Sequence, residues 1–175
     1  MVKKDRKKQK KELIVKILKY ADTKVVFAEV PDQITLAINI SNCPCHCEGC
    51  HSPYLAEDIG EPLTIKALDT LIITNKGITC VSFMGGDSDP LHVEFLAEHI
   101  KRTYPDIKVA WYSGKETIYD KLDLWNFDYI KIGPYIKEKG PLNERTTNQK
   151  FYRVVHMSSG KNKLYDITYK FWKHD

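Results

Sequence analysis

Residues 34–53 read ITLAINISNCPCHCEGCHSP, a strand-like segment that runs straight into a loop rich in cysteine. In the first part, four aliphatic residues (Ile34, Leu36, Ile38 and Ile40) alternate strictly with small or polar ones. Such alternation predicts a β-strand with one face in an apolar core and the other in different surroundings. This strand would deliver the cysteine loop from its carboxyl end.

Strand and helix patterns alternate along the rest of the chain. Upstream, residues 12–21 and 24–30 predict two strands with a turn near Asp22. Downstream, the periodicity predicts helices at 64–77, 89–104 and 115–125, and strands at 79–84, 108–114 and 127–133. Thr64 and Asp89 are the predicted N-caps, Pro90 suits a first helical position, and Gly77 predicts a helix end. The predicted apolar helix faces are Ile65, Leu68 and Ile72; Val93, Leu96, Ala97 and Ile100; and Ile118, Leu122 and Trp125.

This order predicts an α/β fold with a mostly parallel sheet, because strands that alternate with helices pair in parallel. The strands are two-faced, and in the last of them Ile130 and Ile132 oppose Tyr129 and Lys131. A strand covered by helices on both faces would be apolar throughout. We therefore expect helices on one face and a polar ligand on the other, as in a partial, open (β/α) barrel, with an open doubly wound sheet as the alternative. Residues 151–157 and 164–172 predict strands or a closing flap.

Four unusual loops follow the carboxyl ends of predicted strands. They are the cysteine loop, GGD at 85–87, YSG at 112–114 and KIGPY at 131–135. Open α/β sheets and barrels bind their ligands at that edge. We expect the four loops to build one site.

The chain of 175 residues fits one domain, which we place at 13–175 after a basic tail at 1–12. Residues 1–11 carry a net charge of +6, whereas the remainder carries −2. A tail of this kind fits an acidic partner, but no aromatic or groove-reading motif accompanies it, so we favour a solvated terminus and expect no nucleic acid. The sequence shows no membrane-spanning run and no secretory signal, which predicts a cytoplasmic protein without membrane contact.

The clustered cysteines are not equivalent. Cys43, Cys47 and Cys50 are spaced C-x3-C-x2-C, and in a reducing compartment such a cluster suits metal binding better than disulfides. Three thiolates on a short loop can hold three irons of a cubane cluster and leave the fourth iron open to a substrate. Cys45 sits two residues from both neighbours, a poor spacing for one compact cluster.

A structural zinc site is the rival interpretation. It would add Cys45, His46 or His51 to the same three cysteines. The spacing favours an iron–sulfur cluster over zinc. Structural zinc sites usually combine a C-x2-C pair with a second such pair, and no second pair follows in the chain. The remaining cysteine, Cys80, lies in an apolar run and is predicted to be a small core residue.

Four stretches together resemble the radical S-adenosylmethionine (radical SAM) superfamily. They are NCPCHCEGCHSPYL (42–55), FMGGDSDPL (83–91), WYSGK (111–115) and KIGPYIKEKGPLNERTTNQKFYRV (131–154). Short chains of this layout resemble the activases of glycyl-radical enzymes. GPL followed by TTNQ is similar to the family that activates anaerobic ribonucleoside-triphosphate reductase.

By this resemblance, Cys43, Cys47 and Cys50 would ligate a [4Fe–4S] cluster with one open iron. The expected SAM contacts are Gly49, Cys50 and His51 near the adenine; Gly85, Gly86 and Asp87 at the methionyl amino group; Ser113 at the ribose or carboxylate; and Lys131 at the carboxylate. No catalytic side chain is implied beyond these cofactor-binding residues. The chain has Gly49 where many relatives have an aromatic residue, and Asp87 where many have glutamate.

The resemblance implies an oxidoreductase that reductively cleaves SAM and generates a glycyl radical on the large subunit of anaerobic ribonucleoside-triphosphate reductase. Its electron donor would be flavodoxin or ferredoxin. One alternative is an activase of another glycyl-radical enzyme, of the formate-lyase type. An alternative from another class is a zinc-stabilised binding module.

Overall fold

The computed structural model describes residues 17–172, so the predicted basic tail at 1–12 and the first half of the predicted strand at 12–21 lie outside the described residues. The strands are β1 Lys19–Val26, β2 Thr35–Ile40, β3 Glu61–Pro62, β4 Cys80–Met84, β5 Lys108–Tyr112, β6 Tyr129–Ile132, β7 Lys150–His156 and β8 Asn162–Asp166. The helices are α1 Ile65–Thr74 and α2 Pro90–Thr103, with short 3-10 helices η1 Pro53–Ala56, η2 Leu124–Asn126 and η3 Thr168–Phe171. No helix within 17–172 is long and apolar enough to cross a membrane.

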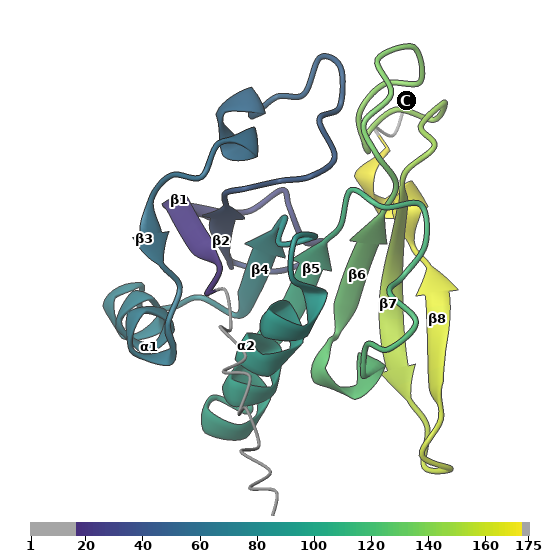
Figure 1. Ribbon diagram of the computed structural model, residues 1–175. Coiled ribbons are helices and arrows are strands. Elements are labelled where there is room, and N and C mark those ends of the chain that lie inside the picture. The colour runs from purple at the N-terminus through teal and green to yellow at the C-terminus, as the bar shows by residue number, and fades with distance from the viewer. Residues whose placement is uncertain (1–16, 173–175) are drawn as a thin grey trace, which may run out of the picture.

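One sheet of eight strands, in the order β3-β1-β2-β4-β5-β6-β7-β8, runs through the described chain (Figure 1). Its central strands β2, β4, β5 and β6 pair in parallel, and the flanking strands pair antiparallel. The fold is therefore mixed α/β with an open, largely parallel sheet, consistent with a partial radical SAM barrel, and the predicted fold class is confirmed. Parallel pairing brings the carboxyl ends of the central strands to one edge, at the top of Figure 1.

The main core lies between this sheet and the helices. Thr64 and Asp89 cap α1 and α2 as predicted, each accepting a hydrogen bond from a backbone N–H three residues on. The core-facing side of α2 is fully buried and consists of Val93, Leu96, Ala97 and Ile100. It packs in one cluster with alternate strand residues, among them Leu36, Ile38, Ile40, Val81, Phe83, Val109, Trp111 and Ile130. Each large side chain buried here contributes about 1.5–3 kcal/mol.

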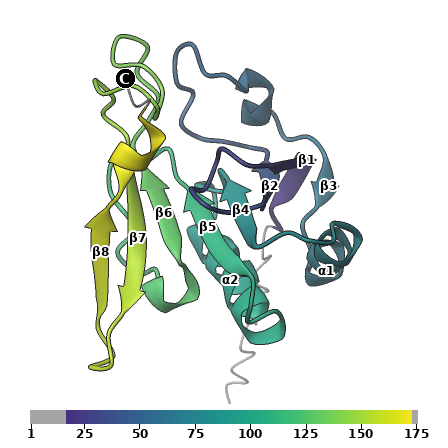
Figure 2. The ribbon, with the colours of Figure 1, turned by 180° about the vertical axis from the view of Figure 1, so that it is seen from behind.

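The opposite face of the sheet carries neither α1 nor α2 (Figure 2). The loop between β1 and β2 crosses it, and η3 lies beside the upper end of β7. Val30, Cys80, Ala110 and Phe151 form a smaller apolar cluster that is separate from the main core. Cys80 is fully buried in it, as predicted.

Two predicted elements are wrong. No turn lies near Asp22, because β1 runs through it and a bulge between Tyr20 and Asp22 shifts its register against β2. Residues 115–125 form no α-helix, and only η2 is helical there. Tertiary contacts hold this segment in an irregular path: the Asp123 N–H donates to the Glu94 carboxylate over 3.0 Å, and Trp125 is about half exposed rather than in the core.

The C-terminal residues resolve the choice between strands and a flap. β7 pairs antiparallel with β6, and β8 pairs antiparallel with β7, so a hairpin extends the sheet. After β8 the chain leaves the sheet and forms the 3-10 helix η3, Thr168–Phe171.

Gly86, at the carboxyl end of β4, is predicted to be intolerant of any side chain. Its φ is +92°, and an alanine Cβ would lie 2.6 Å from Cγ2 of the buried Val93. Gly77 has nearly the same backbone, at φ +89°, but no neighbour within 4 Å of the added atom. We expect Gly86→Ala to lower the free energy of unfolding by about 2–4 kcal/mol and Gly77→Ala by about 1 kcal/mol. Urea unfolding of both variants measures the difference, and equal losses would contradict the packing described here.

Candidate functional site

The carboxyl edge of the sheet brings together the four loops singled out in the sequence. Figure 1 shows the loop after β2 and the loop between β6 and β7 rising side by side above this edge. Side-chain and backbone hydrogen bonds connect the loops after β4, β5 and β6, and the Cys45 thiol connects the loop after β2 to the same group. The prediction that these loops share one rim is confirmed by those contacts.

The cysteine loop is shaped by its own backbone. Its first residues are fastened to η1 and the segment after it: the Cys43 N–H donates to the Leu55 carbonyl over 2.8 Å, and the Asn42 N–H donates to the Glu57 carbonyl over 2.9 Å. A second turn closes where the Cys50 N–H donates to the Cys47 carbonyl over 3.2 Å. The two ends of the cysteine loop are therefore hydrogen-bonded to each other.

Three of its cysteines line one cavity. This cavity has a volume of 230 Å³ and is lined by Cys43, His46, Cys47, Cys50, Ser52, Pro53 and Ala56. All the cysteines are free thiols, and those of the loop are partly exposed. Three cysteine thiolates on a short loop are the donor set of an iron–sulfur cluster, so the residues fit that group.

No three His, Cys, Asp or Glu side chains within 17–172 are already arranged around a single metal position. Cys43, Cys47 and Cys50 nevertheless line the same cavity, and their thiols are the ones that would hold a cluster there. Cys45 and His51 do not line it, whereas His46 does. Of the alternative fourth ligands considered for zinc, only His46 is therefore placed with the three cysteines.

The GGD turn after β4 positions a buried carboxylate. Gly85 and Gly86 both have positive φ, which turns the chain sharply between β4 and α2. Asp87, only 9% exposed, accepts a 2.5 Å hydrogen bond from the Ser113 hydroxyl and a 2.8 Å bond from the Gly114 N–H. The predicted residues Asp87 and Ser113 are thus joined directly, and the carboxylate ties the β4 loop to the β5 loop.

Lys131 brings a buried cation to the same rim. Its ammonium group donates to the Gly133 carbonyl over 2.6 Å and to the Ser113 carbonyl over 3.4 Å. Burial lowers the pKa of Lys131 to about 8, against the opposing effect of Asp87 and of the thiols of the cysteine loop. As predicted from strand alternation, this side chain lies on the side of β6 opposite Ile130, which is in the main core.

Gly49 and His51 lie near an aromatic residue that the sequence analysis did not single out. The rings of His51 and Tyr135 have centroids 5.3 Å apart. An alanine Cβ at Gly49 would lie 3.5 Å from the Tyr135 ring, and Gly49 has φ +73°. The signal was present in the KIGPY motif, but only the fold places this tyrosine beside the last predicted ligand, Cys50.

The TTNQ stretch has a structural role that spacing could not reveal. The Asn148 amide donates to the Pro134 carbonyl over 2.9 Å, and the Thr146 hydroxyl donates to the Lys139 carbonyl over 2.8 Å. These bonds fold the end of the loop back onto its beginning. They hold the segment that carries Tyr135 above the rim.

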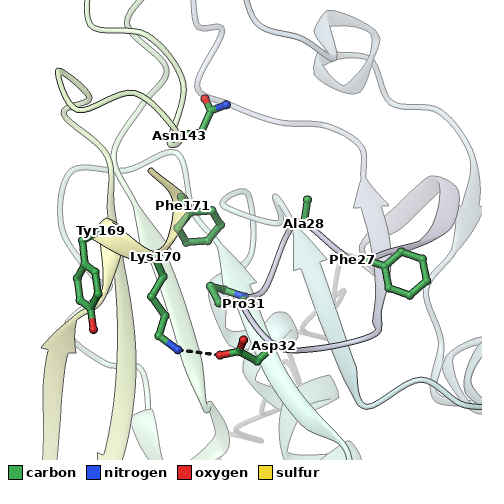
Figure 3. Close-up of a pocket in the computed structure, with 8 residues that line it drawn as sticks. All are labelled: Phe27, Ala28, Pro31, Asp32, Asn143, Tyr169, Lys170 and Phe171. Carbon is green, nitrogen blue, oxygen red and sulfur yellow. Dashed lines mark hydrogen bonds and ion pairs between the residues drawn. The ribbon is translucent and has the colours of Figure 1, made fainter. Parts of the chain in front are cut away.

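A separate groove of 670 Å³ lies between the β1–β2 loop and η3 (Figure 3). Its lining residues are Phe27, Ala28, Pro31, Asp32, Asn143, Tyr169, Lys170 and Phe171. Lys170 and Asp32 form an ion pair of 2.7 Å across it, which links the first hairpin to the C-terminal segment. None of the predicted site residues lines this groove.

The fold and the rim define an α/β protein whose sheet carries a thiol-lined cavity at its carboxyl edge. A protein family described as a 4Fe-4S single cluster domain matches residues 34–154, from β2 through β7. The chain belongs to this family, which is typical of radical SAM activases. The match supports a [4Fe–4S] cluster as the bound group. Searches among curated proteins and among solved structures gave no match.

Cluster binding is expected to depend on three cysteines and not on the fourth. The wild-type protein should be brown after anaerobic reconstitution and contain about four irons per chain. The brown colour and most of the iron should be lost in each of the variants Cys43→Ser, Cys47→Ser and Cys50→Ser. Cys45→Ser is the matched control and should keep both. Visible absorbance and iron analysis measure the outcome. A colourless wild-type protein with a single zinc would contradict this assignment.

The buried ammonium of Lys131 should make the stability of the cluster-free protein depend on pH. The pKa of Lys131 is about 8 in the folded protein and 10.5 for a solvent-exposed lysine, as in the unfolded chain. The unfolded chain therefore keeps the lysine proton to a higher pH than the folded protein does. Burying the charge therefore costs stability below about pH 8, and this cost disappears as the pH rises towards 10.5. Relative to Lys131→Met, the wild type should gain roughly 1–3 kcal/mol of unfolding free energy between pH 8 and 10. Urea titrations at several pH values test this, and a constant difference between the two proteins would contradict it.

Proposed function

We propose that this protein is a radical SAM activase that generates a glycyl radical on anaerobic ribonucleoside-triphosphate reductase. The observation that supports it most directly is the combination, at one rim, of a three-thiol cavity with two buried groups of opposite charge, Asp87 and Lys131. The thiols and Asp87 are close enough to Lys131 to affect its pKa. A metal site for stability alone would not need a charged pair beside it.

These two charges complement the methionyl end of SAM, which carries an ammonium group and a carboxylate. An ammonium has three N–H donors, and Lys131 uses two on backbone carbonyls, which leaves one for a ligand carboxylate. A carboxylate has about four lone-pair positions, and Asp87 retains capacity beyond its bonds to Ser113 and Gly114. In this proposal the backbone of Gly85 and Gly86 receives the methionyl amino group beside Asp87, and His51 and Tyr135 flank the adenine.

The electron transfer and the radical chemistry would be carried out by the cofactors and not by protein side chains. When bound and reduced by flavodoxin or ferredoxin, a [4Fe–4S] cluster held by Cys43, Cys47 and Cys50 would supply the electron for reductive cleavage of SAM, the chemistry by which such activases generate a radical on a glycine of their partner. The protein's own residues hold three irons, orient SAM and exclude water. No side chain of the rim is required as a general base.

The reductase is the proposed target because of the stretch GPLNERTTNQ at 140–149, which resembles that group of activases. In this proposal the partner's large subunit presents its glycine loop at the carboxyl edge of the sheet, where the four loops meet. A formate-lyase type of glycyl-radical enzyme is the competing target.

The proposal predicts two separable activities. With dithionite or reduced flavodoxin under anaerobic conditions, the reconstituted protein should form methionine and 5′-deoxyadenosine from SAM. Addition of the reductase large subunit should then give a glycyl radical visible by electron spin resonance. Lys131→Met should weaken SAM binding by roughly tenfold or more, the loss of one charge-assisted hydrogen bond. SAM cleavage with no radical on the reductase would point to another glycyl-radical enzyme, and no cleavage at all would overturn the proposal.

A further inference from the structure

Cys45 is the one cysteine of the loop that does not line the cavity. The lining of that cavity includes Cys43, Cys47 and Cys50 but not Cys45. The next residue, His46, has a left-handed backbone with φ +45°, which is uncommon outside glycine. The chain thus reverses direction beside Cys45, and its side chain is directed to the rim of the sheet.

On the rim, Cys45 occupies a space that exists because residue 114 is glycine. An alanine Cβ at Gly114 would lie 2.6 Å from the Cys45 sulfur and 3.2 Å from its Cβ. Gly114 does not have a positive φ, so its backbone conformation does not itself require glycine. Because Gly114 has no side chain, the Cys45 thiol can pack against the loop after β5.

The same thiol reaches the carboxylate that joins the β4 and β5 loops. The Cys45 S–H donates to Oδ2 of Asp87 over 3.8 Å, and that oxygen also accepts the Gly114 N–H. Asp87 is held on its other oxygen by Ser113. Cys45 therefore contacts both partners of the β4–β5 junction from a third loop, the one that carries the predicted cluster ligands.

We infer that Cys45 is a positioning residue that seats the cysteine loop on Gly114 and Asp87 and so sets where the three ligand thiols stand relative to the SAM-facing rim. This seating, meaning the contact of Cys45 with Gly114 and Asp87, is present in the chain without any cofactor. Its consequence for SAM rests on the proposed function. Cys45 does not line the cavity, although its thiol lies beside that of Cys43, and it acts through Asp87 and through the path of the loop.

The seating is tested on the cluster-free, reduced protein, where SAM plays no part. Gly114→Ala should destabilise the wild-type chain by displacing the sulfur, whereas in a Cys45→Ala background the added methyl group should cost much less, because Sγ is gone. Urea unfolding of the two single variants and the double variant gives this coupling. Additive effects of the two substitutions would overturn the inference.

Thiol alkylation followed by mass spectrometry tests the same contact without relying on stability. In the wild type, Cys45 should be alkylated more slowly than Cys43, Cys47 and Cys50. In Gly114→Ala, provided the variant folds, its rate should rise about fivefold, the equivalent of losing one hydrogen bond of ordinary strength. An unchanged rate in a folded Gly114→Ala variant would also overturn the inference.

The consequence for SAM is tested on the reconstituted protein by equilibrium dialysis and iron analysis. Cys45→Ala should keep its iron but bind SAM about fivefold more weakly, and Cys45→Ser, which restores a donor of similar size, should recover most of the affinity. Full iron with unchanged SAM affinity in Cys45→Ala would overturn the positioning role. If the wild type itself fails to bind SAM, the proposed function fails, while the coupling between Cys45 and Gly114 still decides the seating.

Discussion

The buried carboxylate of Asp87 is the interaction on which the arrangement of the rim depends. It lies at the end of β4 and receives the Ser113 hydroxyl and the Gly114 N–H from the end of β5. A carboxylate removed from water is tolerated only when its oxygens are hydrogen-bonded. The loops after β4 and β5 are consequently fixed relative to each other, and the cysteine loop after β2 joins them through Cys45.

The fourth loop is held by a complementary group. The ammonium of Lys131 bonds to the carbonyls of Ser113 and Gly133, which links the end of β6 to the same junction. Asn148 and Thr146 then fold the remainder of that loop back onto itself. Four separate chain segments thus meet in one polar rim, and one of them, the cysteine loop, lines the cavity together with η1.

Much of this could be predicted from local patterns. The N-caps Thr64 and Asp89 and the apolar face of α2 are set by short-range geometry, and both were confirmed. The alternation of residues 34–41 was confirmed for Leu36, Ile38 and Ile40, which are buried in the main core, but was wrong for Ile34, which precedes β2 and is exposed. The predicted helix at 115–125 was wrong because long-range bonds, such as that between Asp123 and Glu94, determine that segment. The same limit applies to the site. The strand order predicted that the loops would meet, but contacts between distant residues, such as Cys45 with Gly114 and Tyr135 with His51, depend on the folded backbone and have no signature in spacing.

We propose that the cavity holds a cluster with three cysteine ligands and an open iron, where SAM binds. Electron spin resonance of the reduced, reconstituted protein with and without SAM tests it most directly. An open iron predicts that the cluster spectrum changes when SAM is added and that SAM labelled at its amino nitrogen or carboxylate shows coupling to the cluster. A spectrum that SAM leaves unaltered, with no such coupling, would contradict the account.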